Sequence, residues 1–314
     1  MNLTKKLALE LNKNELVISS FLTNAPNKYK VYKIPKRTHG YRTIAQPTSE
    51  LKKYQRSFIK LFDFPVHNSA MAYRKGKSIK NNAFVHSKNK YLLKTDLENF
   101  FNSITPELFW KCLQSCSETT PSFNLNEKKL VEKILFWCPS KIKGGKLVLS
   151  VGAPSSPEIS NFCLYNFDKI LFEICESQNI KYTRYADDLT FSTNTKDTLF
   201  TLIPIIRRLL KECFNDHIRL NHSKTVFSSK AHNRHITGVT IDNNGNLSLG
   251  RERKRYIKHL VNNYRFNKLD ESDKNHLRGL LAFASHIEPI FILRLKEKYT
   301  NNIIDSLCGA GYEQ

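Results

Sequence analysis

The sequence predicts an α+β fold in which helices cover an antiparallel sheet. Two pairs of neighbouring segments alternate in the β manner and are rich in β-branched and aromatic residues, at 29–34 with 41–45 and at 180–185 with 189–193. Longer segments with apolar residues at helical spacing lie between and after these pairs. The chain has 314 residues, 40% of them hydrophobic, so it is long enough for two or three subdomains with an apolar core.

The N-terminal third begins with an amphipathic helix at 1–21, since apolar residues recur along one side of this segment. Either Thr48 or Ser49 would cap a later helix, because a side-chain oxygen there accepts from free backbone N–H groups. The other elements predicted in this region are a basic hairpin with strands at 29–34 and 41–45, a helix at 48–62, a basic loop at 68–80 and a helix near 78–87.

The rest of the chain contains two helices with clear start signals. Pro106 begins one, and Ser156 followed by Pro157 caps a long helix predicted at 156–178. The remaining predicted elements are a short strand ending at Asp96, a helix at 127–138, a hairpin turn at 141–146, a helix at 196–214, strands at 225–229 and 236–241, and helices at 251–264, 271–286 and 288–300.

The net charge of +22 indicates a polyanionic partner, and nucleic acid is the usual one. The charge is unevenly distributed: residues 1–95 hold 20 Lys and Arg against 4 Asp and Glu. Residues 96–250 hold 18 against 16, and residues 251–314 hold 12 against 8. The N-terminal third is therefore the strongest candidate for binding phosphates, with a solubilising basic surface as the alternative.

The cellular setting is predicted from the cysteines and the apolar runs. The seven cysteines are scattered, and no second Cys or His pair gives Cys112 and Cys116 the spacing of a zinc site. They are expected to be reduced thiols of a cytosolic protein. The apolar runs fall short of a membrane span and the N-terminus lacks an apolar signal core, so we expect a cytoplasmic protein with no membrane partner.

Two adjacent acids occupy the tip of the hairpin predicted at 180–193. Asp187 and Asp188 repel each other there and gain nothing for folding, but a divalent cation would account for them. For this pair alone, a hairpin turn with solvated acids is the alternative. Asp96, at the end of a strand, would complete a site with three carboxylates. Such a site suits two Mg²⁺ ions roughly 3.5–4 Å apart, which promote in-line phosphoryl transfer.

Five motifs in this order resemble those of reverse transcriptases across most of the chain. They are Arg42-Thr-Ile, Asp96 with Phe100-Phe101, Gly152-Ala-Pro-Ser-Ser-Pro157, Tyr185-Ala-Asp-Asp188 and Leu220-Asn-His-Ser-Lys-Thr225. Each alone is of weak or moderate specificity, whereas the ordered set is highly specific. The resemblance implies a right-hand polymerase, with an N-terminal helix and fingers at 1–95, a palm at 96–240 that carries a fingers insertion at about 105–150, and a helical thumb at 241–314.

Within that superfamily the chain is most similar to retron reverse transcriptases. The compact length, the element Asn82-Ala-Phe-Val-His86 and the triplet Ile236-Thr237-Gly238, where retrons have Val-Thr-Gly, support this assignment. Val151 departs from the family, which usually has Gln before Gly-x-Pro. The resemblance implies RNA-templated DNA synthesis that starts from a 2′-OH of a cognate folded noncoding RNA and gives msDNA, a branched RNA-linked single-stranded DNA. It also implies a role in phage defence with a separate effector protein.

The resemblance assigns roles around the reaction centre. Asp96, Asp187 and Asp188, together with the carbonyl of Leu97, would hold two Mg²⁺ ions, and Lys224 would be a general acid for pyrophosphate. The residues assigned to dNTP binding are Arg42 at the triphosphate, Phe101 as a steric gate against a ribose 2′-OH, and Gly152 and Ala153 as close backbone neighbours. The alternatives are core packing for Phe100 and Phe101, and solvated turn charges for Lys36 and Arg37.

RNA binding is assigned to three groups of residues. Asn82 and His86 would contribute to binding or processing the cognate RNA, or else be a polar cap and a satisfied histidine. The triplet Ile236, Thr237 and Gly238 would also contact that RNA. The thumb helix would follow duplex phosphates with five cations, which are Arg251, Arg253, Lys254, Arg255 and Lys258.

Two other classes of function remain as alternatives. One is another small bacterial reverse transcriptase, although intron enzymes usually carry an added maturase region, and diversity-generating enzymes usually have Ser-Gln where this chain has Ser156-Pro157. The other is a noncatalytic RNA-binding scaffold. A scaffold would have no need of three converging carboxylates in a protein with a net charge of +22.

Overall fold

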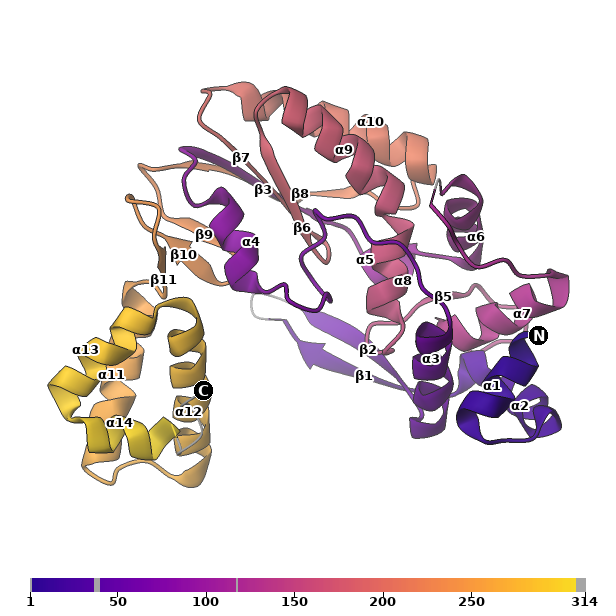
Figure 1. The fold of residues 1–314 in the computed structure, drawn as a ribbon, viewed down its shortest axis with the longest axis horizontal. Coiled ribbons are helices and arrows are strands. Elements are labelled where there is room, and N and C mark those ends of the chain that lie inside the picture. Colours follow the sequence, from indigo (N-terminus) through magenta and orange to yellow (C-terminus); the bar gives the residue numbers. More distant parts are fainter. Residues whose placement is uncertain (1, 37–39, 117, 309–314) are drawn as a thin grey trace. The chain divides into compact units, whose positions relative to one another are not determined.

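The computed structural model describes residues 2–36, 40–116 and 118–308, so Arg37 lies outside the described residues. The chain forms two compact units. Unit 1 holds Met1–Tyr73, Lys94–Leu189 and Phe200–Thr225, and unit 2 holds Arg74–Leu93, Thr190–Leu199 and Val226–Gln314. Figure 1 shows the elements of both units along the chain. The division into fingers, palm and thumb stays a prediction.

Unit 1 begins with two helices where the sequence predicted one. Asn12 takes a left-handed conformation with φ of 50° and ends the first helix, and the Asn14 side chain accepts from Leu16 N to start the second. The elements of this region are α1 (Leu3–Leu11), α2 (Glu15–Leu22), the 3₁₀ turn η1 (Ala25–Asn27), β1 (Tyr29–Pro35), β2 (Tyr41–Pro47) and α3 (Ser49–Leu61). As predicted, β1 and β2 form an antiparallel hairpin, and Thr48 caps α3.

Two predicted helices of unit 1 are shorter than expected. The one predicted at 127–138 ends at Leu135, because Phe136 and Trp137 instead pair with Leu149 and Val148. The one predicted at 156–178 is divided at Leu164, and its N-cap position is Ser155 rather than Ser156. The elements concerned are α5 (Phe100–Ser103), α6 (Pro106–Ser115), α7 (Leu125–Leu135), β4 (Phe136–Trp137), β5 (Val148–Leu149), α8 (Ser156–Cys163) and α9 (Tyr165–Ser177).

A four-stranded sheet has the order β6-β7-β3-β8. Its strands are β3 (Tyr91–Leu97), β6 (Lys181–Tyr185), β7 (Asp188–Thr193) and β8 (Leu220–Ser229). In unit 1, α9 packs against β6 and lies beside α10 (Leu202–Phe214), as Figure 1 shows. The helix predicted at 196–214 begins later than expected, at Leu202, because the 3₁₀ turn η2 (Thr198–Thr201) precedes α10. The strand predicted at 225–229 extends back to Leu220.

Unit 2 contains a small sheet and a group of C-terminal helices. The segment predicted as one strand at 236–241 is a hairpin, because Thr237 and Gly238 both take positive φ, of 45° and 87°, as a tight two-residue turn requires. The elements are α4 (Ile79–His86), β9 (Arg234–Ile236), β10 (Val239–Ile241), β11 (Leu247–Ser248), α11 (Arg251–Arg265), α12 (Glu271–Ile287), α13 (Pro289–Tyr299) and α14 (Asn301–Cys308). Helices α11–α14 group together at the C-terminal end (Figure 1).

One apolar core holds unit 2 together. Ala83 of α4, Val239 of β10 and Leu281 of α12 are all buried in it, together with apolar residues of α11, α13 and α14. Burying a large aliphatic side chain contributes about 1.5–3 kcal/mol, so this shared core accounts for the packing of α4 and the small sheet on the helices. Among the described residues, no helix is both long and apolar enough to cross a membrane.

Candidate active site

The turn between β6 and β7 presents two of the three predicted carboxylates. Ala186 has a φ of 58°, an uncommon conformation for a residue with a side chain, and Asp187 and Asp188 follow it directly. Leu97 N donates to the carbonyl of Asp187 at 3.0 Å, which fixes the end of β3 beside the turn. This bond explains how Asp96, one residue before Leu97, comes close to the hairpin.

The three acids form one cluster. One carboxylate oxygen from each of Asp96, Asp187 and Asp188 lies within 4.8 Å of the others, and their exposure increases in that order from buried to exposed. Burial raises the pKa of Asp187, the Asp96 charge raises it further, and Lys224 and Arg42 oppose the shift. Burial and the charge of Asp187 raise the pKa of Asp188 to about 6. A divalent cation bound here would offset both causes of these shifts, the burial of the carboxylates and their mutual repulsion.

Two side chains of β8 contact Asp96. Lys224 Nζ lies 2.7 Å from Asp96 Oδ2, and Asn221 Nδ2 donates to Asp96 Oδ1 at 3.2 Å. Partial burial would lower the pKa of Lys224, but the hydrogen bond to Asp96 and the neighbouring carboxylates raise it instead. Lys224 is therefore a protonated side chain that is more than half exposed at the edge of the acidic cluster.

A buried charge network behind the turn was missed in the sequence. Arg184 Nε and Nη2 donate to both carboxylate oxygens of Asp168, at 2.6–3.1 Å. The remaining nitrogen, Nη1, donates to the carbonyl of Ala186 at 3.0 Å and to Asn161 Oδ1 at 3.1 Å. Tyr182 also donates to Asp168, at 2.7 Å. In the sequence, Asp168 shares a helix face with apolar residues and Arg184 lies within a strand. These two opposite charges at positions expected to be buried were the available signal for a buried ion pair.

The residues predicted at the nucleotide differ in exposure. Arg42 is exposed on β2, Phe101 is half-buried, and Phe100 is 3% exposed with its ring centroid 5.3 Å from that of Phe101. This burial assigns Phe100 to the core and leaves Phe101 available as a gate. The side chain of Ala153 is buried, so only its backbone can face a nucleotide.

Gly152 is required by its surroundings. Its φ is +123°, and a Cβ atom there would lie 3.2 Å from Ile44 Cγ2 and 3.3 Å from the carbonyl oxygen of Ala45. Ala45 N donates to the carbonyl of Val151 at 3.1 Å, so this loop is held directly against β2. Val151, which replaces the usual Gln, thus contributes a backbone contact that does not depend on its side chain.

Three of the residues predicted to bind RNA present almost no surface. Asn82 and Ile236 are 0% exposed and His86 is 1% exposed. The ring of His86 hydrogen-bonds Ser192 Oγ at 2.7 Å, and Asn82 Nδ2 donates to Thr237 Oγ1 at 3.3 Å. His86 thus connects α4 to β7, and Asn82 connects α4 to the turn at Thr237. A part for these residues in binding or processing the cognate RNA stays a prediction.

The other predicted RNA-binding residues fall into two groups. Arg253 Nη1 donates to the carbonyl of Gly238 at 2.9 Å, and Lys254 Nζ lies 2.6 Å from Glu288 Oε1, so both hold unit 2 together. By contrast, Arg251, Arg255 and Lys258 are exposed on α11. Of these five cations, Arg251, Arg255 and Lys258 are the ones accessible to a polyanion.

The sequence of the chain matches the family described as reverse transcriptase (RNA-dependent DNA polymerase) over residues 34–241. The chain therefore belongs to the reverse transcriptase family and is an RNA-directed DNA polymerase. It is 51% identical over 281 residues to the Retron Ec83 reverse transcriptase of Escherichia coli, with 89% of each chain covered. It is 32% identical over 299 residues to the Retron Ec73 reverse transcriptase of the same organism, with 91% of each chain covered. These matches place it among the retron reverse transcriptases, as the motifs predicted.

Two solved structures are similar to this chain at lower sequence identity. A foamy viral protease-reverse transcriptase in complex with double-stranded DNA is 16% identical, with 89% of this chain and 43% of that chain covered and a TM-score of 0.46. A telomerase from Candida tropicalis is 13% identical, with 90% of this chain and 64% of that chain covered and a TM-score of 0.47. The predicted α+β polymerase fold is confirmed by the family match and by the mixed helices and antiparallel sheets of the structure.

Proposed function

We propose that this protein synthesises msDNA, a branched RNA-linked single-stranded DNA, on a cognate structured noncoding RNA, with two Mg²⁺ ions at Asp96, Asp187 and Asp188. The observation that carries the proposal is the meeting of these three carboxylates within 4.8 Å. Similarity to retron reverse transcriptases over most of the chain supports the kind of product. Oxygen-only ligands of this sort suit Mg²⁺.

The chain's own residues would prepare the reaction. The three aspartates, with the carbonyl of Leu97, would bind the metal ions; when bound, the ions would activate the attacking hydroxyl and stabilise the leaving oxygen. Lys224, kept protonated beside Asp96, would donate a proton to pyrophosphate. In this proposal Lys224 would act as the acid beside the carboxylates that bind the metal ions, and its 2.7 Å contact with Asp96 supports that role.

The nucleotide would be selected by its neighbours. Arg42 would bind the triphosphate, since a guanidinium forms paired hydrogen bonds with phosphate oxygens. The ring of Phe101 would clash with a ribose 2′-OH. Gly152 and Ala153 would let the backbone approach the nucleotide closely. Together these contacts would select a deoxyribonucleotide.

The larger organisation is part of the same proposal. Residues 1–95 would form the fingers, 96–240 the palm and 241–314 the thumb, with the exposed cations of α11 following duplex phosphates. A separate effector protein would complete a system of phage defence. Similarity to retron enzymes supports this arrangement.

The first experiment uses protein expressed from its native locus with the neighbouring noncoding RNA. Co-purifying nucleic acid is extracted, digested with RNase and compared between the wild type and Asp187→Asn. We expect a discrete single-stranded DNA, initially joined to RNA, that is absent from the variant. Asp216→Asn is the matched control, because Asp216 is exposed and has a positive φ that asparagine tolerates.

The outcomes test the product, the polymerase activity and the metal site separately. A defined RNA-linked DNA that depends on Asp187 supports msDNA synthesis. Primer extension on an added RNA template without such a DNA keeps the polymerase but rejects the product, and points to another kind of bacterial reverse transcriptase. Extension that survives Asp187→Asn, or that continues after Mg²⁺ is chelated, rejects the proposed metal site.

A further inference from the structure

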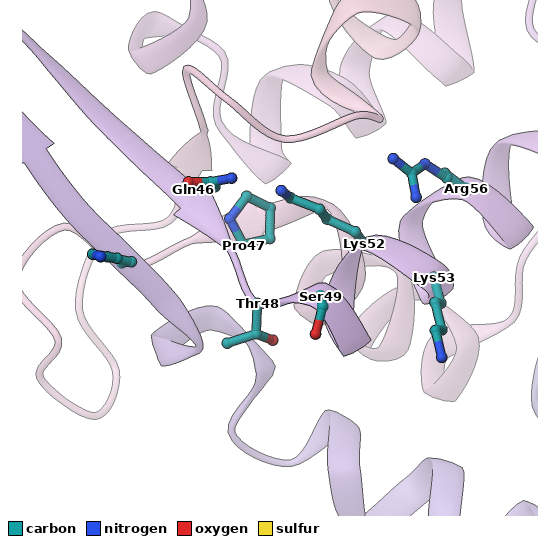
Figure 2. A pocket seen from close by; sticks show the side chains of 8 residues that line it. Gln46, Pro47, Thr48, Ser49, Lys52, Lys53 and Arg56 are labelled. Carbon is teal, nitrogen blue, oxygen red and sulfur yellow. The ribbon is translucent and has the colours of Figure 1, made fainter.

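A cationic pocket in unit 1 shares no lining residue with the candidate active site. It has a volume of about 610 Å³, and Figure 2 shows its side chains. Its lining residues are Lys30, Gln46, Pro47, Thr48, Ser49, Lys52, Lys53 and Arg56. They come from β1, from β2, from the N-cap of α3 at Thr48 and from the first two turns of α3.

Local structure brings these residues together. Lys30 and Gln46 are direct partners across the β1–β2 hairpin, and Thr48 N donates to the carbonyl of Lys28 at 3.0 Å, which holds the start of α3 against β1. Lys52 and Arg56 are four residues apart and therefore lie on one side of α3. Lys52 extends from α3 towards Gln46 in Figure 2.

The charge of the cationic pocket is not balanced from within. None of its lining residues is acidic. Within the described part of the chain, Lys30, Lys52 and Arg56 form no ion pair, and Lys53 lies 3.9 Å from Glu50. Cations of one sign around a hollow repel one another and concentrate the field there, so the arrangement attracts an anion.

The lining also restricts what kind of anion fits. The hydroxyls of Thr48 and Ser49 and the amide of Gln46 can hydrogen-bond sugar and phosphate oxygens, and the 2′-OH distinguishes RNA. Bases are commonly held by stacking on aromatic rings, and the lining contains none. Contacts to the strand's backbone position a nucleic acid without reading its sequence.

We propose that the cationic pocket binds the backbone phosphates of an RNA strand, independently of base sequence. This inference rests on the proposed function, in which a structured RNA is the template. It adds a binding site at the base of the β1–β2 hairpin, made of residues other than the exposed cations of α11.

The test is RNA binding without dNTPs, so that no synthesis occurs. Fluorescence anisotropy with labelled oligo-rU and oligo-rA compares the wild type with Lys30→Gln/Lys52→Gln/Arg56→Gln over a range of salt concentrations. Because this variant lacks three cations that would each neutralise a phosphate, the slope of log K against log salt should fall by about 2, and affinity at 0.1 M salt should fall by roughly 30- to 100-fold on both oligomers. Lys30→Arg/Lys52→Arg should bind like the wild type, since it keeps the charges.

A matched control removes the same number of charges elsewhere. Lys141→Gln/Lys143→Gln/Lys146→Gln changes three exposed lysines between β4 and β5, and it should leave affinity and salt slope near those of the wild type. Equal losses in the two triple variants would mean that only net charge matters and would overturn the site. A loss confined to one oligomer would overturn sequence independence.

Further outcomes separate this site from the proposed function. If the wild type extends a primer and the pocket variant binds RNA normally, the pocket inference fails and the polymerase assignment stands. If the pocket variant binds RNA normally but shows a raised KM for dNTPs, the pocket serves the nucleotide, which also overturns the inference. If the wild type neither binds nor copies RNA, the proposed function itself fails.

Discussion

Arg184 and Asp168 form an ion pair in which both side chains are 0% exposed, with Arg184 Nη2 2.6 Å from Asp168 Oδ2. The same guanidinium donates to the carbonyl of Ala186, the residue with positive φ that precedes Asp187. Arg184 N also donates to Ser69 O, and Met71 N donates to Arg184 O. The buried Arg184 therefore stabilises the turn through the backbone at Ala186, next to the two candidate metal ligands Asp187 and Asp188.

Removing one member of this pair should cost more than removing both. Arg184→Leu leaves Asp168 charged and buried, so we expect a loss of about 3–5 kcal/mol in the free energy of unfolding. Arg184→Leu/Asp168→Leu should recover most of that loss, because paired apolar residues can replace a buried ion pair. Urea unfolding of the two variants and the wild type measures the difference. A double variant less stable than the single one would contradict this account.

The double variant also separates stability from positioning. It lacks the donor to the carbonyl of Ala186, and a hydrogen bond from a charged group contributes about 1.5–3 kcal/mol. We therefore expect the Mg²⁺ concentration for half-maximal primer extension to rise by about tenfold, even where stability is restored. Wild-type Mg²⁺ dependence in a stable double variant would show that Arg184 and Asp168 do not position the turn.

Sequence patterns predicted the β1–β2 hairpin, the acidic turn and helices α11–α13, because each depends on local periodicity and turn residues. They missed breaks at Asn12 and Leu164 and the turn at Thr237 and Gly238, because one or two residues there change the backbone direction inside an otherwise continuous pattern. The proximity of Asp96 and Asp187 was predicted, because one acid ends a strand and the other lies at a hairpin tip. For Asn82 and His86 a polar cap and a satisfied histidine were among the alternatives, but their partners Thr237 and Ser192 could not be predicted, because they lie more than a hundred residues away.

Phe101 should control the choice of sugar. Phe101→Ala removes a half-buried ring, so the ratio of ribonucleotide to deoxyribonucleotide incorporation should rise at least about tenfold. Single-nucleotide extension with matched dNTP and rNTP measures kcat/KM for each. Phe100→Leu is the control, since Phe100 lies in the core and should leave the ratio unchanged while lowering stability. An unchanged ratio in Phe101→Ala would remove the gate role.

His86 should make the fold sensitive to mild acid. Burial lowers the pKa of His86 to about 3, whereas the unfolded chain has a histidine pKa of about 6.5. Between these values only the unfolded state binds the proton, so the His86 contribution is complete above pH 6.5 and is lost as pH falls towards 3. From pH 6.5 to 5 the unfolding free energy should drop by about 2 kcal/mol from this group. Urea unfolding at both pH values measures it.

The matching variants isolate the His86 contribution. His86→Gln keeps a polar side chain but cannot take up the proton, so its unfolding free energy should change less between the two pH values than that of the wild type. His232→Gln, which alters an exposed histidine, should keep the wild-type dependence. Equal pH dependence in the wild type and His86→Gln would show that other groups cause the acid sensitivity.

Two arginines of α11 should differ in what they support. Arg253 donates to the carbonyl of Gly238 and lies over the ring of Phe283, with 4.8 Å from its Cζ to the ring centroid, so Arg253→Met should lower the unfolding free energy by about 1–3 kcal/mol. Arg255 is exposed, so Arg255→Met should change stability by less than about 0.5 kcal/mol. It should instead reduce the salt slope of duplex binding by about 1. Urea unfolding and salt-dependent anisotropy with an RNA–DNA hybrid measure both quantities, and Arg255→Met binding with an unchanged slope would exclude Arg255 from the phosphate contacts of α11.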